Sequence, residues 1–181
     1  MLQSTVTEES ITTAIQQSSI KNAVINFLEQ DKWNFEQNDN VIQINYSTEK
    51  STYDCFLDIL EESNSLLIYS YIGVKIPVEK RLSIAEYITR ANFGLILGNF
   101  EMSFSDGIVR YKTSIKLLDG ELTYKMAGQL LWRNLNVIDD YFSGIMTVVY
   151  SNTSPEDAIQ QIENVDDDIV DDDIEKDTDN N

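Results

Sequence analysis

The sequence predicts an α+β protein in which an antiparallel sheet is combined with helices in the order α-β-β-β-α-β-β-α. Two observations carry this prediction: five β-type runs are separated by short polar turns, and helical apolar periodicity precedes, interrupts and follows them. A length of 181 residues, 42% of them hydrophobic, is enough for one core with extensions.

The first predicted element is an amphipathic helix. Residues 1–16 are polar and are expected to form a flexible N-terminal segment. The apolar positions that follow recur at helical spacing: Ile20, Val24, Phe27 and Leu28. Ser18 or Ser19 is a suitable N-cap for this helix.

Three strands come next, and their order predicts an antiparallel meander. They cover residues 41–46, 52–60 and 66–72, which are rich in alternating, β-branched and aromatic positions. Short polar segments separate them, and Trp33–Glu36 leads into the first through a turn at 38–40.

A second helix is predicted to begin near Pro77, followed by a hairpin. The apolar stripe of this helix is Ile84, Tyr87, Ile88, Ala91 and Leu95. Asp106-Gly107 lies between β-type runs at 100–104 and 108–117, which is typical of a tight hairpin.

The C-terminal part is predicted to contain two more helices and a tail. A long helix covers about 123–150, and Ser154-Pro155 begins a short helix that ends near Glu163. These boundaries predict one domain over residues 17–163. Residues 164–181 are rich in aspartate and lack aromatic residues, so they are expected to form a disordered acidic tail.

The charge of the chain is strongly negative and is spread over body and tail. The formal charge is −18; ten of 31 acidic residues and one of 13 basic residues lie in 163–181, so each part carries −9. Nucleic-acid binding is disfavoured because phosphate contacts need clustered Lys and Arg. No membrane insertion is expected, because no run approaches the about 20 apolar residues of a span.

Residue composition excludes much catalytic chemistry. The chain has no histidine and one cysteine, so triads, metal-histidine sites and disulfides within the chain are excluded. Cys55 lies in an apolar run and is expected to be a buried, inert thiol, which suits a cytoplasmic location. The carboxylate pairs Glu79/Glu86 and Asp139/Asp140 are interpreted as helix surface, and no cofactor or metal is expected.

A small basic row is the one candidate for a partner contact. Arg110, Lys112 and Lys116 alternate along one predicted strand and therefore share a face. They either pair with cross-strand carboxylates such as Glu101, or they contact an acidic segment, which includes the tail of this chain.

Residues 92–112 resemble the YbjN family of bacterial proteins. The matching segments are Asn92–Glu101, Asp106-Gly107 and Val109–Thr113, and the later Asp140–Phe142 and Ser154–Ile159 are also similar. The resemblance covers about residues 17–163 and leaves out the acidic tail. Gly94 and Gly98 fit close backbone packing in this pattern.

The resemblance implies a fold like that of the type III secretion chaperones, which are small acidic dimers. The family label "sensory transduction regulator" brings no catalytic residues with it. By analogy with those chaperones, Ile84, Tyr87, Ile88 and Ala91 lie at a homodimer contact; the alternative is that they form ordinary core.

These observations predict a protein-binding module without enzymatic activity, chaperone- or adaptor-like, which acts as a homodimer on a protein partner or client. The alternative is a regulator of a signalling or transcription system that works through protein contacts. An enzyme that uses carboxylates alone is disfavoured, because no reaction can be named for it.

Overall fold

The computed structural model describes residues 20–118 and 120–170, with residues 164–170 described by their backbone alone. The expected flexible segment 1–16, the capping serines 18 and 19, and residues 171–181 of the expected tail lie outside this range.

A six-stranded antiparallel sheet in the order β1-β2-β3-β4-β6-β5 forms one layer of the fold. Its strands are β1 Glu36–Asn38, β2 Val41–Ser47, β3 Thr52–Leu60, β4 Ser65–Lys75, β5 Asn99–Met102 and β6 Ile108–Lys116. The helices are α2 Ile20–Gln30, α3 Arg81–Gly94, α4 Tyr124–Tyr150 and α5 Pro155–Val170, with 3₁₀ turns η1 Glu61–Ser63 and η2 Val78–Lys80. This arrangement confirms the predicted α+β class and the predicted order of elements.

One strand was not predicted, and several boundaries differ: β4 extends to Lys75 instead of 72, β5 ends at Met102 instead of 104, and α3 begins at Arg81 instead of near Pro77. Strand β1 was not predicted, because all its residues are exposed and its sequence has no apolar alternation. It pairs with β2 across a two-residue turn in which Asp39 has a left-handed φ of 50°. The prediction that the last helix ends near Glu163 is wrong, because α5 continues to Val170.

The start of α5 is as predicted, and its extension has a cause in the sequence. Ser154 Oγ accepts a hydrogen bond from the Asp157 backbone N–H at 3.1 Å, so it caps the helix. Beyond the cap the apolar positions of the sequence keep helical spacing through the aspartates: Ile159, Ile162, Val165 and Ile169.

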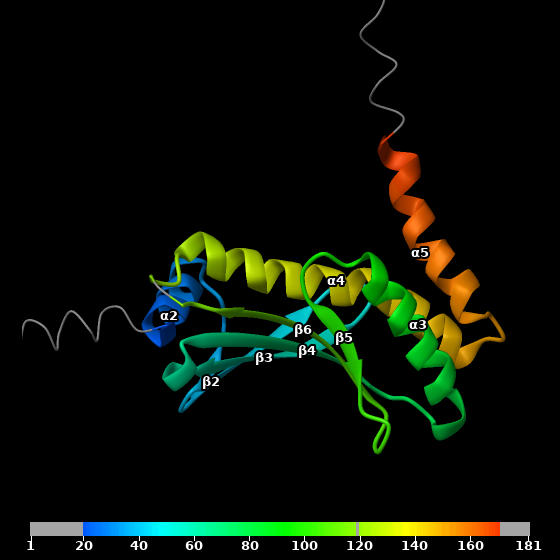
Figure 1. Cartoon of the computed structure of the whole chain (residues 1–181), viewed down its shortest axis with the longest axis horizontal. Helices are drawn as coiled ribbons and strands as arrows, with labels where there is room; N and C mark the ends of the chain where they lie inside the picture. Colours follow the sequence, from blue (N-terminus) through cyan, green and yellow to red (C-terminus); the bar gives the residue numbers. More distant parts are fainter. Residues whose placement is uncertain (1–19, 119, 171–181) are drawn as a thin grey trace, which may run out of the picture.

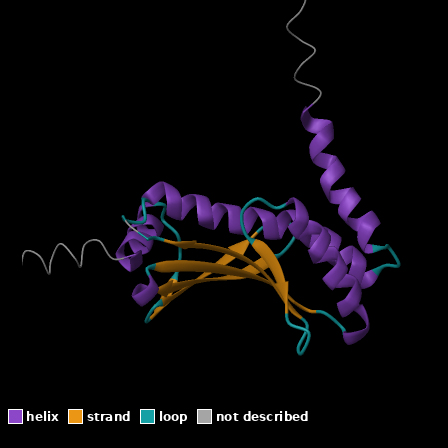
Figure 2. Ribbon diagram, viewed as in Figure 1, coloured by secondary structure: helices purple, strands orange, loops and turns teal. Residues whose placement is uncertain are grey.

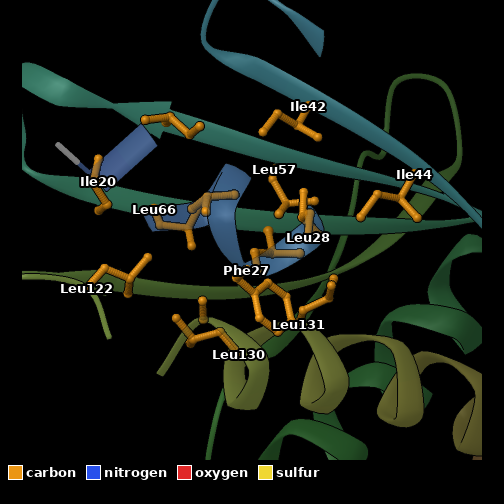
Figure 3. Close-up of a cluster of buried hydrophobic side chains, with 14 of the residues drawn as sticks. Ile20, Phe27, Leu28, Ile42, Ile44, Leu57, Leu66, Leu122, Leu130 and Leu131 are labelled. Atoms are coloured by element: carbon orange, nitrogen blue, oxygen red, sulfur yellow. The ribbon is translucent and has the colours of Figure 1, made fainter. Parts of the chain in front are cut away.

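The helices pack on one face of the sheet, as Figure 2 shows. Alternate strand residues such as Ile44, Leu57 and Ile68 are buried on that face. One half of the core lies between α2, the first part of α4 and the sheet (Figure 3). The other half lies between α3, α5, the second part of α4 and the sheet. The long helix α4 therefore joins both halves (Figure 1).

Asn134 is a buried polar residue in the middle of α4 and fixes the position of this helix on the sheet. Its side chain is 0% exposed. Its Oδ1 accepts a hydrogen bond from Ser70 Oγ at 2.5 Å, and its Nδ2 lies 3.0 Å from Ile68 O. The same nitrogen lies 3.3 Å from Tyr111 O and 3.2 Å from Thr113 Oγ1. These partners belong to β4 and β6, so sliding of α4 would leave several buried polar groups unpaired.

Asn92 closes the outer edge of β5. Its Oδ1 accepts from Phe100 N at 2.7 Å, and its Nδ2 donates to Phe100 O at 3.1 Å. These backbone groups would otherwise be available to another strand. The Asn92 side chain therefore blocks the addition of another strand at Phe100.

Gly94, the last residue of α3, and Gly98, just before β5, have different roles. A Cβ on Gly98 would lie 2.5 Å from Lys112 O, and its φ of 86° is left-handed, so close backbone packing is confirmed there. Gly94 has space for a Cβ, since the nearest atom, Glu163 Oε1, is 3.9 Å away. The expectation of close packing is therefore wrong for Gly94.

We expect Asn134→Ala to lower the free energy of unfolding by about 3 kcal/mol, because Ser70, Thr113 and two carbonyls lose a buried partner. The matched control is Asn136→Ala on the exposed side of the same helix, which should change it by at most about 0.5 kcal/mol. Urea unfolding, followed by the fluorescence of the Trp33–Trp132 pair, measures both. Equal effects of the two substitutions would show that the buried network does not hold α4.

Candidate functional site

The face of the sheet opposite the helices carries no described element, and we call it the open face (Figures 1 and 2). Because side chains alternate along strands, the residues between the buried ones point to this face. Its centre is aromatic: Phe56 and Tyr69 are directly paired, and Phe56 contacts Tyr71 edge to face at 5.7 Å between ring centroids. Aromatic side chains left half-buried on a sheet surface are suited to protein contact.

The predicted basic row lies on the open face, and two of its three members form ion pairs with Glu101. Arg110 Nη2 lies 2.7 Å from Glu101 Oε2, and Lys112 Nζ forms an ion pair with the other oxygen of the same carboxylate. Lys116 is exposed at the far end of β6 and has no ion pair with a described residue. The expected cross-strand pairing with Glu101 is thus present for Arg110 and Lys112.

Arg110 is held in a fixed position by aromatic neighbours as well as by Glu101. Its guanidinium carbon lies 4.1 Å from the centroid of the Tyr69 ring, and Nη1 donates to the Tyr71 hydroxyl at 3.2 Å. The side chain is 34% exposed, so part of it faces solvent. A guanidinium fixed on aromatic rings in this way is suited to binding a further carboxylate.

Glu101 is the only carboxylate of this described cluster and is held ionised. Its partial burial alone would raise its pKa, but the hydrogen bonds and charges of Lys112 and Arg110 together lower the pKa below its usual range. Two cations therefore share one anion, and the cluster keeps one net positive charge.

Three adjoining hollows lie on the open face. The first, about 280 Å³, is lined by Asp54, Phe56, Tyr71, Gly73, Val74, Lys75, Ile108 and Val109. The second, about 340 Å³, shares Tyr71 and Ile108 with it and is also lined by Glu101, Met102, Ser103, Asp106 and Arg110. The third, about 460 Å³, shares Phe56 and extends to β1 and β2. The open face is therefore uneven, with its hollows joined at Phe56 and Tyr71.

The residues predicted at a dimer contact lie inside the monomer. Ile84, Tyr87, Ile88 and Ala91 are buried against α4, α5 and the sheet. Tyr87 also donates a hydrogen bond to Tyr141 O at 3.1 Å. A second copy cannot reach these side chains without opening the core, so the alternative, ordinary core, describes them.

Exposed apolar residues on the opposite side of α3 and in the segments that flank it were not predicted from the sequence, and we call them the α3 stripe. They are Val78 in η2, Leu82 and Phe93 on α3, and Ile96 after α3, and they are 73%, 77%, 96% and 96% exposed. Leu82 and Phe93 are eleven residues apart, close to three turns, so they share one side of the helix. The sequence does contain an indication of these exposed residues. Apolar residues lie on two opposite sides of α3, whereas a helix that packs on a core from the surface needs only one apolar side.

Asp139, the first residue of the carboxylate pair Asp139/Asp140, has a structural role. Its Oδ1 accepts hydrogen bonds from Thr48 Oγ1 at 2.6 Å and from Tyr53 Oη at 2.8 Å, and Lys50 lies 3.4 Å from Oδ2. Burial would raise the pKa of Asp139, but these partners lower it below its usual range. Asp139 thus ties α4 to the β2–β3 turn.

Cys55 is fully buried, as predicted. Burial raises the pKa of its thiol to about 12, so the reactive thiolate is not populated at neutral pH.

Among the residues whose side chains the structure describes, no group of three or more Cys, Asp or Glu is placed to hold a metal ion. No described helix is both long enough and apolar enough to cross a membrane.

Fold and surface together define an α+β protein with helices on one face of its sheet and an open opposite face. The chain belongs to the YbjN family: the family model, described as "Putative bacterial sensory transduction regulator", matches residues 21–146. This confirms the resemblance found in the sequence and places the chain in a regulator-type family.

A solved structure has the same fold. It is the crystal structure of YbjN from E. coli, described as "a putative transcription regulator", with a TM-score of 0.50 and 12% identity. The match covers 70% of this chain and 86% of that one. At this identity the likeness shows the fold alone. No curated protein matches the chain.

We expect Glu101→Gln to destabilise the protein at neutral pH and to have little effect in acid. A carboxyl group with a lowered folded-state pKa contributes stability above its ordinary value of 4.5, and this contribution is lost as pH falls through the folded-state pKa. Urea unfolding of both proteins between pH 7 and pH 3 measures the difference. A difference that stays constant over this range would contradict the ion-pair cluster.

Proposed function

We propose that this protein is a non-enzymatic protein-binding module, adaptor- or chaperone-like, that works as a homodimer. The observation that carries the proposal is the apolar stripe of α3. Two large apolar side chains on the outer side of α3 and two in the segments that flank it are each more than 70% exposed, and such a concentration of exposed apolar residues favours a protein contact. The absence of histidine from the sequence and the regulator-type family description support a role without catalysis.

The arrangement of charges along α3 favours a second copy as the occupant of the stripe. Leu82 and Phe93 lie at nearly equal distances from the middle of α3, and Glu86 and Arg90 lie between them in the same symmetric way. In an antiparallel pair related by a two-fold axis, Leu82 faces Phe93 of the other copy, and the Glu86–Arg90 ion pair that each copy forms at 2.9 Å lies beside that of the other. The stripe is therefore self-complementary, as an isologous dimer requires.

The net charge of the chain sets a condition on such a dimer. Two copies that each carry −18 repel one another at long range, so the contact must be stabilised by apolar burial at short range. Salt screens the repulsion more than it affects apolar burial, so the dimer is expected to tighten with ionic strength.

The second candidate function is regulation of a signalling or transcription system through protein contacts. It is supported by the family description as a sensory transduction regulator. The acidic body disfavours direct contact with nucleic acid. Affinity purification separates the two functions, because unfolded or secreted clients support the first and a kinase or transcription factor supports the second. We propose a cytoplasmic location for both functions, because a chain with a single cysteine suits a reducing compartment.

The dimer is tested by Leu82→Glu, which places a charge opposite Phe93 of the other copy. We expect the dissociation constant to rise at least about tenfold, because the carboxylate loses its hydration against Phe93 of the other copy. Sedimentation equilibrium at tens of micromolar protein, at low and high salt, measures it.

The matched control is Leu118→Glu, since Leu118 is 84% exposed but lies after β6, away from the stripe. It should leave the dissociation constant unchanged. A wild-type protein that stays monomeric at tens of micromolar, or equal weakening by both substitutions, would refute the dimer through α3.

A further inference from the structure

An apolar dent on the open face is created by an irregularity in strand pairing. The register of β4 with β6 shifts between Tyr71 and Lys75, and Gly73 lies in the shifted segment. A Cβ on Gly73 would meet no atom closer than Thr52 O at 3.9 Å, so this position has unfilled space. The hollow of about 280 Å³ at this point is walled by Phe56, Tyr71 and Ile108. Its shape suits one bulky apolar side chain from outside.

The dent adjoins a site for an anion. Tyr71 and Ile108 also line the next hollow, of about 340 Å³, which contains Arg110. Arg110 is fixed there by the Tyr69 ring and by its hydrogen bond to Tyr71. An apolar anchor in the dent would therefore place a neighbouring residue of the same ligand beside a guanidinium.

The charges of this half of the open face favour a carboxylate as that neighbour. Arg110 and Lys112 share Glu101 as their ion-pair partner among the described residues, so the cluster has one positive charge to spare. Lys75 and Asp54 line the dent, and Asp106, which Lys75 stabilises electrostatically, lines the next hollow. The charges around the dent are therefore mixed, and the local excess of positive charge lies at Arg110 and Lys112. A second carboxylate would restore balance at the cluster.

We propose that the open face binds an extended segment of another protein in which a bulky apolar residue is followed by an acidic one. The apolar side chain fills the dent at Gly73, and the carboxylate contacts Arg110 and Lys112. This inference rests on the proposed protein-binding function and specifies the chemistry of the partner. The contact is on the face of the sheet, because Asn92 closes the edge of β5 to strand addition.

Two other occupants fit less well. A second copy is assigned to the α3 stripe, which is a different surface. The tail of this chain follows α5, and α5 projects from the side of the sheet opposite the open face (Figure 1). The tail has no aromatic residue, although Ile174-Glu175 has the required order of an apolar and an acidic residue, so a variant of this pair tests the tail directly.

The test uses three blocked tetrapeptides, Ser-Phe-Glu-Ser, Ser-Phe-Lys-Ser and Ser-Ser-Glu-Ser, titrated into the full chain and followed by amide NMR shifts. The first should shift the signals of Gly73, Ile108 and Arg110. It should bind at least about tenfold more tightly than either of the others, because each lacks one of the two contacts. Equal shifts by all three peptides, or no shift on the open face at millimolar peptide, would overturn the proposal.

Matched variants separate the site from diffuse charge. Arg110→Gln should weaken binding of Ser-Phe-Glu-Ser about tenfold and leave Ser-Phe-Lys-Ser unaffected. Lys116→Gln removes the same charge from the same strand outside both hollows and should have little effect. The Trp33–Trp132 fluorescence reports that each variant is folded. Equal loss in the two variants would show that charge alone attracts the peptide and would overturn the site.

The role of the tail is tested in a full-length variant carrying Asp171→Asn, Asp172→Asn, Asp173→Asn, Ile174→Ser and Glu175→Gln. Without peptide, its Gly73 and Arg110 signals should match those of the wild type. Movement of these signals would assign the site to the tail and overturn the proposal. Because dimerisation is measured separately by sedimentation, a dimer that binds no peptide refutes this inference alone, whereas a monomer that binds peptide refutes only the dimer.

Discussion

The hydrogen bonds of Asn134 beneath α4 are the interaction on which the rest of the structure depends. Apolar packing alone allows a long helix to slide or turn over a sheet, since many apolar contacts are nearly equivalent. The amide of Asn134 fits in one place, between the hydroxyls of Ser70 and Thr113 and the carbonyls of β4 and β6. A buried polar network of this kind adds specificity of position to the stability supplied by apolar burial.

The fixed position of α4 determines both candidate surfaces. Because α4 joins the two halves of the core, α2 packs at one end of it and α3 and α5 pack towards the other (Figure 1). Asp139 adds a second polar tie, to Thr48 and Tyr53. The described helices are thereby placed on one face of the sheet. The opposite face carries none of the described elements, and the outer side of α3 is not covered by any of them.

Features that follow from periodicity were predictable from the sequence, whereas features set by contacts between distant segments were not. Alternation located β2, β3, β4 and β6, and helical spacing located α4 to within a residue or two. Strand β1 has no apolar face, and the register shift after Tyr71 depends on pairing with β6. The dent at Gly73 could therefore not be predicted.

The candidate sites show the same division. The row of Arg110, Lys112 and Lys116 was visible because strand residues alternate, but the Tyr69 ring beneath Arg110 was not, since β4 is remote in sequence. In α3, the analogy with the type III secretion chaperones placed the dimer contact on the side of the helix that contains Ile84 and Ala91. That side of the helix is buried in the core, whereas the opposite side, with Leu82 and Phe93, is exposed.

The central claim is that the two surfaces have different occupants: a second copy covers the α3 stripe, and the open face stays free for a partner. Relaxation of side-chain NMR signals by a soluble paramagnetic agent, at a concentration where the chain is dimeric, tests this directly. The account predicts that Phe93 and Ile96 are protected while Tyr71 and Arg110 are strongly relaxed. Strong relaxation of Phe93 together with protection of Tyr71 would contradict it.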